Sequence, residues 1–363
     1  MVDRRLGCTV HKRQRLVLLL GAGSTIHAGV PSTDDVTKRV CALTEEGISL
    51  VVRGLREREP RLDFNFETVL AALEDLEEYT RGARSGSARE TLSIFTNLSP
   101  YYRLFEPDEK RSSIFRTRTS LLNGIFQLFI KATVNLPAEE LKTFIDCLRR
   151  DFDITVVTLN YDDLIDRAGD WFDGFVSNGE SDEYRVFDPM QFRARVFSDP
   201  AVLLHLHGSI RFGRRPQRGS GIVKYESPEK ALRSLGSKSV PMGGEAPIIS
   251  GYKKERWLNT YVTPFGYYYN AFMNAALDCP LWIIGGYGGN DLHVSTWVGE
   301  HRRIYGKDAR TVLVDKRDDL SQLSGSLSTA VSQTIRFYGG ADKGNFPPNR
   351  FVDDIIAFLK REH

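Results

Sequence analysis

The chain has 363 residues, enough for one large domain or two modest ones. Hydrophobic residues make up 41% and charged residues 26%, an ordinary globular composition that excludes disorder of the whole chain. The formal net charge is only +2, without the basic excess of a dedicated nucleic-acid-binding protein. We therefore do not expect direct nucleic-acid binding.

The cysteines are too scattered for a zinc site or a disulfide framework, because Cys8, Cys41, Cys147 and Cys279 form no Cys-x-x-Cys pair. We expect reduced thiols, a cytoplasmic protein and no metal. The charged N-terminus does not resemble a signal peptide. No window of about 18 apolar residues predicts a membrane span.

Six short apolar runs predict strands buried on both faces of a parallel sheet. They are residues 16–20, 154–158, 202–206, 281–284, 311–314 and 334–338. Helical patterns lie between them, and residues 351–359 predict a closing helix. Strands that alternate with helices in this way indicate an α/β fold with a doubly wound, Rossmann-like parallel sheet.

A long helical segment separates the first predicted strand from the second. Apolar residues recur at helical spacing over residues 66–76, and residues 91–98 and 120–134 continue the pattern. The chain is therefore expected to form a Rossmann-like domain and an inserted helical module, residues 14–37 with 151–363 and residues 38–150, respectively.

The segment 211–250 is rich in Gly, Arg, Ser and Pro and predicts a long loop. Loops of this length are commonly mobile or functional, so the segment is a candidate lid or contact surface. Its arginines are more simply explained as solvated charges.

A glycine turn follows the first predicted strand. Gly21 and Gly23 leave room for a diphosphate, and the N–H groups of such a turn favour an anion. Ile26 occupies the position of the third glycine of the dinucleotide-binding motif, and no Gly-Lys-Ser/Thr sequence indicates a P-loop. The glycines could equally serve only to bend the chain.

Polar residues follow two further strands, at the edge of the sheet where α/β proteins bind ligands. Asn160 and Asp162 could hold a ribose hydroxyl or a water, or could simply cap the next helix. His205 and His207 are candidate general bases, and would share a face if the strand ran through both. Either histidine could instead be structural.

A second glycine-rich turn spans Gly285 to Asn290 and precedes Asp291. Its glycines could line the other side of a dinucleotide cleft. Asp291 could bind ribose hydroxyls or only cap the helix that follows.

In this order, the motifs resemble the sirtuin family. Residues 21–31 are similar to its Gly-Ala-Gly-x-Ser-x-x-Ala-Gly-Ile-Pro element, 158–162 resemble Thr-Gln-Asn-x-Asp, and 207–208 match His-Gly. The motifs at residues 65–67, 206–209 and 286–291 more closely resemble a bacterial sirtuin-like branch of antiviral defence. The resemblance spans about residues 16–315.

Departures from the sirtuin pattern weigh against protein deacylation. Sirtuin deacylases carry a four-cysteine zinc module after the catalytic histidine, whereas only Cys279 follows His207 here. Thr25 replaces the family's Ser, and residues 32–34 replace Asp-Phe-Arg. The resemblance therefore implies hydrolysis of NAD⁺ at the nicotinamide–ribose bond, which depletes NAD⁺ in antiviral defence.

The resemblance also implies roles for individual residues. Asn160 would orient the ribose or the attacking water, and His207 would accept a proton. Asp162 would contact the nicotinamide end, and Asp315 is a weaker candidate for the adenosine ribose. The remaining cofactor-binding residues are those of the two glycine turns: Gly21, Ala22, Gly23 and Thr25 for the diphosphate, and Gly286, Tyr287 and Asp291 along the cofactor.

The same resemblance implies a homo-oligomer, in some relatives paired with a hexameric HerA-type ATPase translocase. Two other functions stay open. One is NAD-dependent deacylation or ADP-ribosyl transfer in the same cleft. The other is a non-catalytic module that binds NAD or ADP-ribose.

Overall fold

The computed structural model describes residues 13–43, 46–58, 64–85, 110–177, 179, 181–215, 221–236, 246–248, 263–317, 335–340 and 344–361. Across these residues, no helix has both the length and the apolar character that crossing a bilayer requires.

Six parallel strands form the central sheet in the order β10-β9-β8-β1-β2-β5. Numbered by their order in the chain, these strands run 6-5-4-1-2-3, the doubly wound Rossmann arrangement. The predicted fold class and all six predicted strands are therefore confirmed. The strands are β1 (Gln14–Leu20), β2 (Phe152–Thr158), β5 (Ala201–His205), β8 (Leu281–Gly285), β9 (Arg310–Asp315) and β10 (Ile335–Gly339).

The central strand β1 shows why continuous apolar runs form this sheet. Residues 16–20 are at most 1% exposed, because helices cover the sheet and neighbouring strands flank both edges of β1. In the ladder, Leu18 pairs with Val156 on one side and Ile283 on the other. A polar residue in this run would be buried on either face of the sheet, so apolar and polar residues do not alternate along β1.

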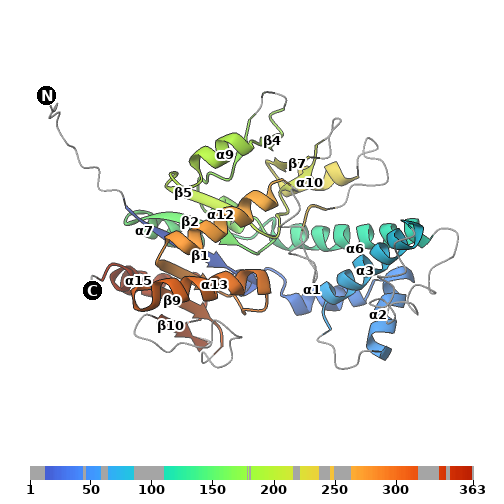
Figure 1. The fold of residues 1–363 in the computed structure, drawn as a ribbon, viewed down its shortest axis with the longest axis horizontal. Coiled ribbons are helices and arrows are strands. Elements are labelled where there is room, and N and C mark those ends of the chain that lie inside the picture. The colour runs from blue at the N-terminus through green and yellow to red at the C-terminus, as the bar shows by residue number, and fades with distance from the viewer. Residues whose placement is uncertain are drawn as a thin grey trace.

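Two helical layers cover the sheet (Figure 1). In one, α7 (Glu139–Arg149) packs against β2 and against α15 (Val352–Leu359), the predicted closing helix. In the other, α12 (Phe265–Asp278) packs against β5 and α13 (Leu292–Tyr305). Because the chain moves in opposite directions along the sheet through α7 and α12, right-handed crossovers place the two layers on opposite faces.

Four helices gather beyond one end of the sheet (Figure 1). They are α1 (Thr33–Cys41), α2 (Glu46–Arg58), α3 (Phe66–Ser85) and α6 (Lys110–Thr133). Helix α3 packs along α6 and contacts α1 and α2. Predicted helical residues 66–76 lie in α3, residues 120–133 lie in α6, and residues 91–98 lie outside the described residues. The division into two domains stays a prediction.

A small antiparallel sheet, in the order β3-β4-β7-β6, was not expected from the sequence. It corrects the prediction of a long loop over 211–250, since residues 212–214 pair with 222–224 and a helix follows. Ser227 caps that helix and Pro228 starts it. The elements are β3 (Phe175–Val176), β4 (Tyr184–Phe187), α9 (Pro189–Arg195), β6 (Phe212–Arg214), β7 (Ile222–Tyr225) and α10 (Pro228–Leu235).

The remaining short helices are η1 (Ala22–Ser24), η2 (Ile26–Ala28), α8 (Leu164–Arg167), η3 (Gly306–Asp308) and η6 (Asn349–Phe351). Of these, η1 and η2 follow β1 directly, and α8 follows β2. These short elements therefore lie at the carboxyl edge of the sheet, where the polar motifs meet.

Candidate active site

A cavity of about 520 Å³ opens at the carboxyl ends of β1, β2, β5 and β8. The order of strands reverses between β1 and β8, and this is where open α/β sheets bind ligands. The start of α3 contributes Asn65, Phe66 and Glu67 to the wall, so the helical group closes one side of the cavity.

The two glycine turns interlock at this switch point. The backbone N–H of Gly21 donates to Gly285 O at 3.0 Å, and that of Gly23 donates to Gly286 O at 2.9 Å. Gly286 has a φ of +59°, and a Cβ there would lie 2.0 Å from Ser24 N. Only glycine allows so close a backbone contact at this conformation.

The contact changes the interpretation of the first turn. The N–H groups of Gly21, Gly23, Ser24 and Thr25 all donate to backbone carbonyls, so the turn does not offer these four donors to a phosphate. Gly23 faces Gly286 and is not among the residues that line the cavity, whereas Gly21, Ala22 and Thr25 are.

Asn160 is held in one orientation by two hydroxyl groups. Its Nδ2 donates to Ser24 Oγ at 3.0 Å and to Thr25 Oγ1 at 3.3 Å. Ser24 donates its own hydroxyl proton to Gly21 O at 2.7 Å. Thr25 donates its proton to Asp162 Oδ2 at 3.1 Å. Since both hydroxyls present lone pairs to Asn160, the NH₂ end must face them.

The other end of the amide is therefore a fixed acceptor. Asn160 Oδ1 is buried and has no hydrogen-bond partner among the described residues. Asn160 lines the cavity and is only 7% exposed. A buried oxygen of this kind normally has a partner, so its position indicates a bound water or ligand group.

Asp162 links this network to the start of α8. Its Oδ1 accepts from the backbone N–H of Leu164 at 3.1 Å, as the first residue of an Asx turn into α8. Burial raises the pKa of the Asp162 carboxyl to about 6, although the Leu164 and Thr25 hydrogen bonds oppose that rise. At neutral pH the carboxylate is mostly ionised and can accept from Thr25.

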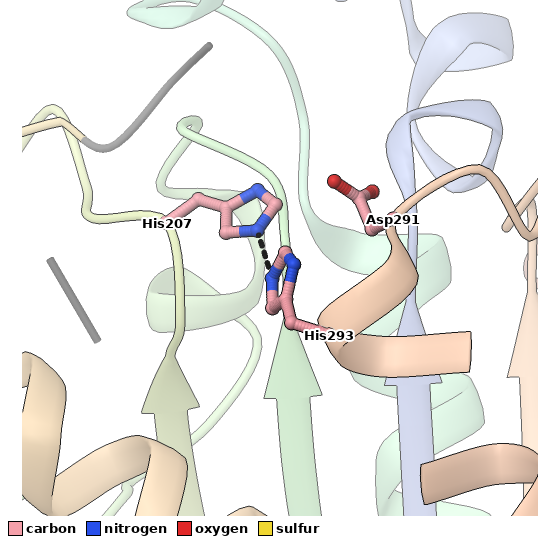
Figure 2. A group of neighbouring side chains, drawn as sticks. All are labelled: His207, Asp291 and His293. Atoms are coloured by element: carbon pink, nitrogen blue, oxygen red, sulfur yellow. Dashed lines mark hydrogen bonds between the residues drawn. The ribbon is translucent and has the colours of Figure 1, made fainter. Parts of the chain in front are cut away.

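His207 meets a second imidazole in the cavity wall. The Nε2 atoms of His207 and His293 lie 3.1 Å apart, and both side chains are buried (Figure 2). At this separation one nitrogen donates and the other accepts. Tyr269 OH donates to the backbone carbonyl of His293 at 3.1 Å and helps to fix the first turn of α13.

Asp291 begins α13, but its side chain does not cap the helix. Figure 2 shows the carboxylate beside the two imidazoles, and potential ligand atoms of His207, Asp291 and His293 all lie within 4.8 Å of one another. Tyr287 OH donates to the backbone carbonyl of Asp291 at 3.0 Å and also contacts Ser295 Oγ at 2.9 Å. These contacts hold the second glycine turn against the helix.

His205 is separated from the cavity because β5 ends at this residue and the chain then turns through Gly208, which has a φ of +95°. The two histidines therefore do not continue along one strand face. His205 Nε2 lies 3.0 Å from Asp166 Oδ2, and Asp166 also pairs with Lys224 of the small sheet at 2.6 Å. This largely buried cluster joins the two sheets.

Asp315 also lies apart from the cavity. Its Oδ1 accepts from Arg317 Nε at 2.7 Å and its Oδ2 from Arg317 Nη2 at 2.9 Å. Neither residue is among those that line the cavity. The Asp315 carboxylate is thus already paired with the Arg317 guanidinium.

The cavity has an acidic wall. Among the described residues that line it, three are carboxylates, Glu67, Asp162 and Asp291, and none is Lys or Arg. Such a wall favours a cation over an anion by Coulomb attraction. Apolar side chains such as Val30, Val36 and Phe129 complete the lining.

The comparisons with known proteins find a domain model that matches the second half of the chain. Residues 154–334 match the model of the SIR2-like domain. The matched segment holds Asn160, Asp162, His207 and the second glycine turn, but begins after the first turn. No curated protein matches the chain.

Solved structures of sirtuins resemble the chain over nearly its whole length. A mutant Sir2 homologue with 2′-O-acetyl ADP ribose is 12% identical, with 99% of each chain covered and a TM-score of 0.47. A Sir2 homologue–NAD complex is 13% identical, with 96% of this chain and 91% of that chain covered and a TM-score of 0.48. The order of the six parallel strands establishes the Rossmann-like fold.

The structure thus brings both predicted catalytic residues, Asn160 and His207, to one cavity. Of the predicted cofactor-binding residues, it places these in the cavity wall: Gly21, Ala22, Thr25, Asp162, Gly286, Tyr287 and Asp291. Gly23 and Asp315 lie outside it. Sequence reasoning missed His293, although its spacing two residues after Asp291 was a usable signal.

Proposed function

We propose that the chain is an NAD⁺ glycohydrolase, which cleaves the nicotinamide–ribose bond to give nicotinamide and ADP-ribose. The observation that carries this proposal is the buried Oδ1 of Asn160, which has no hydrogen-bond partner within the described part of the chain. The fixed acceptor lies in a cavity at the switch point of a SIR2-like domain, with His207 in the same wall.

In this mechanism Asn160 positions the nucleophile. Its Oδ1 accepts a hydrogen bond from the attacking water or from a ribose hydroxyl, and the Ser24 and Thr25 hydroxyls prevent the amide from turning. A preorganised acceptor of this kind costs no reorganisation during the reaction. His207 accepts the proton released by the water or the hydroxyl.

The acidic wall suits the charge that develops on the substrate. Nicotinamide leaves as a neutral molecule and needs no general acid, while the ribose acquires oxocarbenium character. The Asp162 carboxylate lies next to Asn160 in the network and stabilises positive charge at this end of the cavity. Glu67 and Asp291 add to the same field.

Hydrolysis is favoured over deacylation by the cysteine content. Only Cys279 follows His207 in the sequence, which leaves the zinc module of deacylases without its four thiolates. The Cys279 thiol is buried and donates to the Arg15 carbonyl, and burial raises its pKa to about 11. It is therefore a poor metal ligand and a poor nucleophile.

The test is nicotinamide release from NAD⁺, measured for the full chain alone and for the chain mixed with the protein that its genomic neighbour encodes. Asn160→Ala and His207→Ala should each lower the rate about 100-fold or more, since a positioned base contributes about 10²–10⁴. Matched controls are Asn274→Ala, a partly exposed amide on α12, and His27→Ala, a histidine outside the cavity. Wild-type rates in both cavity variants would refute the assignment.

Product analysis separates hydrolysis from the two other functions. Free ADP-ribose supports hydrolysis, whereas O-acyl-ADP-ribose or a modified protein supports transfer. Tight NAD⁺ binding without nicotinamide release, also in the presence of a partner, supports a non-catalytic module. Mass spectrometry and calorimetry on the same preparation distinguish these outcomes.

The cellular role follows from the reaction. An active chain would deplete NAD⁺, as expected of antiviral defence, and needs control by assembly with itself or with a HerA-type ATPase. Cells that carry the wild-type gene should lose NAD⁺ after phage infection, and cells with Asn160→Ala should not. Equal NAD⁺ levels in both strains would contradict this role.

A further inference from the structure

The cavity wall holds a cluster of potential metal ligands that the hydrolytic mechanism does not use in full. His207 comes from the turn after β5, while Asp291 and His293 come from the start of α13. All three line the cavity, and their potential ligand atoms lie within 4.8 Å of one another. Figure 2 shows the two imidazoles facing each other, with the carboxylate of Asp291 beside them.

The spacing of the two imidazoles is close to that of metal ligands. Metal–imidazole bonds of about 2.0–2.1 Å in tetrahedral geometry place two ligand nitrogens about 3.3 Å apart. The Nε2 atoms of His207 and His293 are 3.1 Å apart. An ion therefore requires only a small separation of the rings, and a rotation that brings the Asp291 carboxylate nearer.

The local backbone supports convergence of the ligands. Asp291 has an extended conformation (φ −81°, ψ 101°), and Leu292 between the two ligands is 69% exposed. Asp291 and His293 line the cavity together with Leu292 itself. Tyr269 and Tyr287 bond the backbone carbonyls of His293 and Asp291, and so hold both ligand positions in place.

We propose that His207, Asp291 and His293 bind one divalent transition-metal ion of the Co²⁺, Ni²⁺ or Zn²⁺ class. Two imidazoles and one carboxylate suit these ions, whereas Mg²⁺ and Ca²⁺ prefer oxygen ligands. Three protein ligands leave at least one coordination position open towards the cavity. The acidic wall formed with Glu67 and Asp162 adds attraction for a dication.

Metal binding has a consequence for the site that rests on the proposed function. The ion occupies the Nε2 atoms of both imidazoles, so His207 cannot use that nitrogen to accept a proton. The metal-bound protein is then the inactive form, and its metal-free form hydrolyses NAD⁺. Zn²⁺ should therefore inhibit nicotinamide release, and a chelator should restore it.

The test of binding uses the untagged full chain after treatment with a chelator. Titration with Co²⁺ alone should give visible d–d absorption that saturates at one equivalent, and Zn²⁺ should displace it while excess Mg²⁺ does not. Asp291→Ala and His293→Ala should each weaken Co²⁺ binding by at least about tenfold. Removing a residue that only orients a metal ligand already lowers metal affinity about 10–100-fold.

Asp291→Ala is the cleaner variant, because Asp291 is only partly buried and its side chain does not cap α13. His27→Ala is the matched control, since His27 lies outside the cavity, and should leave the titration unchanged. Circular dichroism checks that each variant is folded. Absence of Co²⁺ absorption in the wild type, or full absorption in both cluster variants, would overturn the proposal.

The experiments distinguish a failure of the metal site from a failure of the proposed NAD⁺ hydrolysis. Saturable Co²⁺ binding that depends on Asp291 and His293, without nicotinamide release under any condition, supports the metal site and refutes hydrolysis. Nicotinamide release that depends on Asn160, without Co²⁺ binding, supports hydrolysis and refutes the metal site. Release that Zn²⁺ does not alter, despite bound metal, refutes the inhibitory role.

Discussion

The buried carboxylate of Asp162 allows a quantitative test of the network that orients Asn160. Burial raises its pKa to about 6 from an ordinary value of 3.8, so the ionised form is disfavoured in the folded protein. The wild type should therefore lose stability relative to an uncharged isostere as the pH rises between these values. The difference between the two pKa values corresponds to a loss of about 3 kcal/mol in the free energy of unfolding, at about 1.4 kcal/mol per pKa unit.

Asp162→Asn removes the ionisation and keeps the side-chain shape. Linkage predicts that the free energy of unfolding of Asp162→Asn, minus that of the wild type, rises by about 2 kcal/mol between about pH 4.5 and pH 7.5. Rearranged hydrogen bonds with Thr25 contribute equally at each pH, so the change with pH isolates the ionisation. Urea denaturation of both proteins at each pH measures it.

Asp166→Asn is the matched control, since Asp166 is equally buried and lies four residues away. Burial alone would raise the pKa of Asp166, but the charges of Lys224 and His205 outweigh burial and hold that pKa well below its usual range. Its stabilisation is present above the unfolded pKa and is lost only in stronger acid. This variant should lose about 3–5 kcal/mol at both pH values. A pH-independent difference for Asp162→Asn would refute the reasoning.

Three further substitutions probe the fold around the site. Gly286→Ala should lower the free energy of unfolding by about 1–3 kcal/mol and weaken NAD⁺ binding, because its Cβ would meet Ser24 N. Thermal melts measure the stability, and calorimetry measures the binding. The control Gly124→Ala in α6, where a Cβ would have no atom within 4 Å, should be neutral or stabilising by up to about 1 kcal/mol. Lys224→Met should lower the free energy of unfolding by about 3–5 kcal/mol in urea denaturation, because it removes the ammonium group that pairs with the buried carboxylates of Asp166 and Asp173. Ser32→Ala should cost about 1 kcal/mol by the same assay, since Ser32 forms the capping box of α1; a loss below about 0.3 kcal/mol would show that the cap contributes little.

The central sheet could be predicted because strands buried on both faces are continuous apolar runs. Strand order then places the residues after β2 and β5 at one edge, so Asn160 and His207 could be expected to lie near each other. Each of these features depends on local sequence or on a general rule of topology.

The missed features depend on contacts between distant segments. Strands β3 and β6 have two and three residues, too few for a period to show, and form only because they pair with β4 and β7. The N–H groups of the first turn were expected to face a phosphate, but they bond to Gly285 and Gly286 across the switch point. His293 gains its importance only from a neighbour 86 positions earlier in the chain.

The first glycine turn also limits how this molecule can be divided. Ser24 and Thr25 orient the Asn160 amide from a segment that lies about 130 residues before the start of the SIR2-like match. A fragment that begins at residue 154 would keep Asn160 and His207 but lose the two hydroxyls and the backbone contact with Gly286. Such a fragment would contain the two proposed catalytic side chains without the groups that orient Asn160.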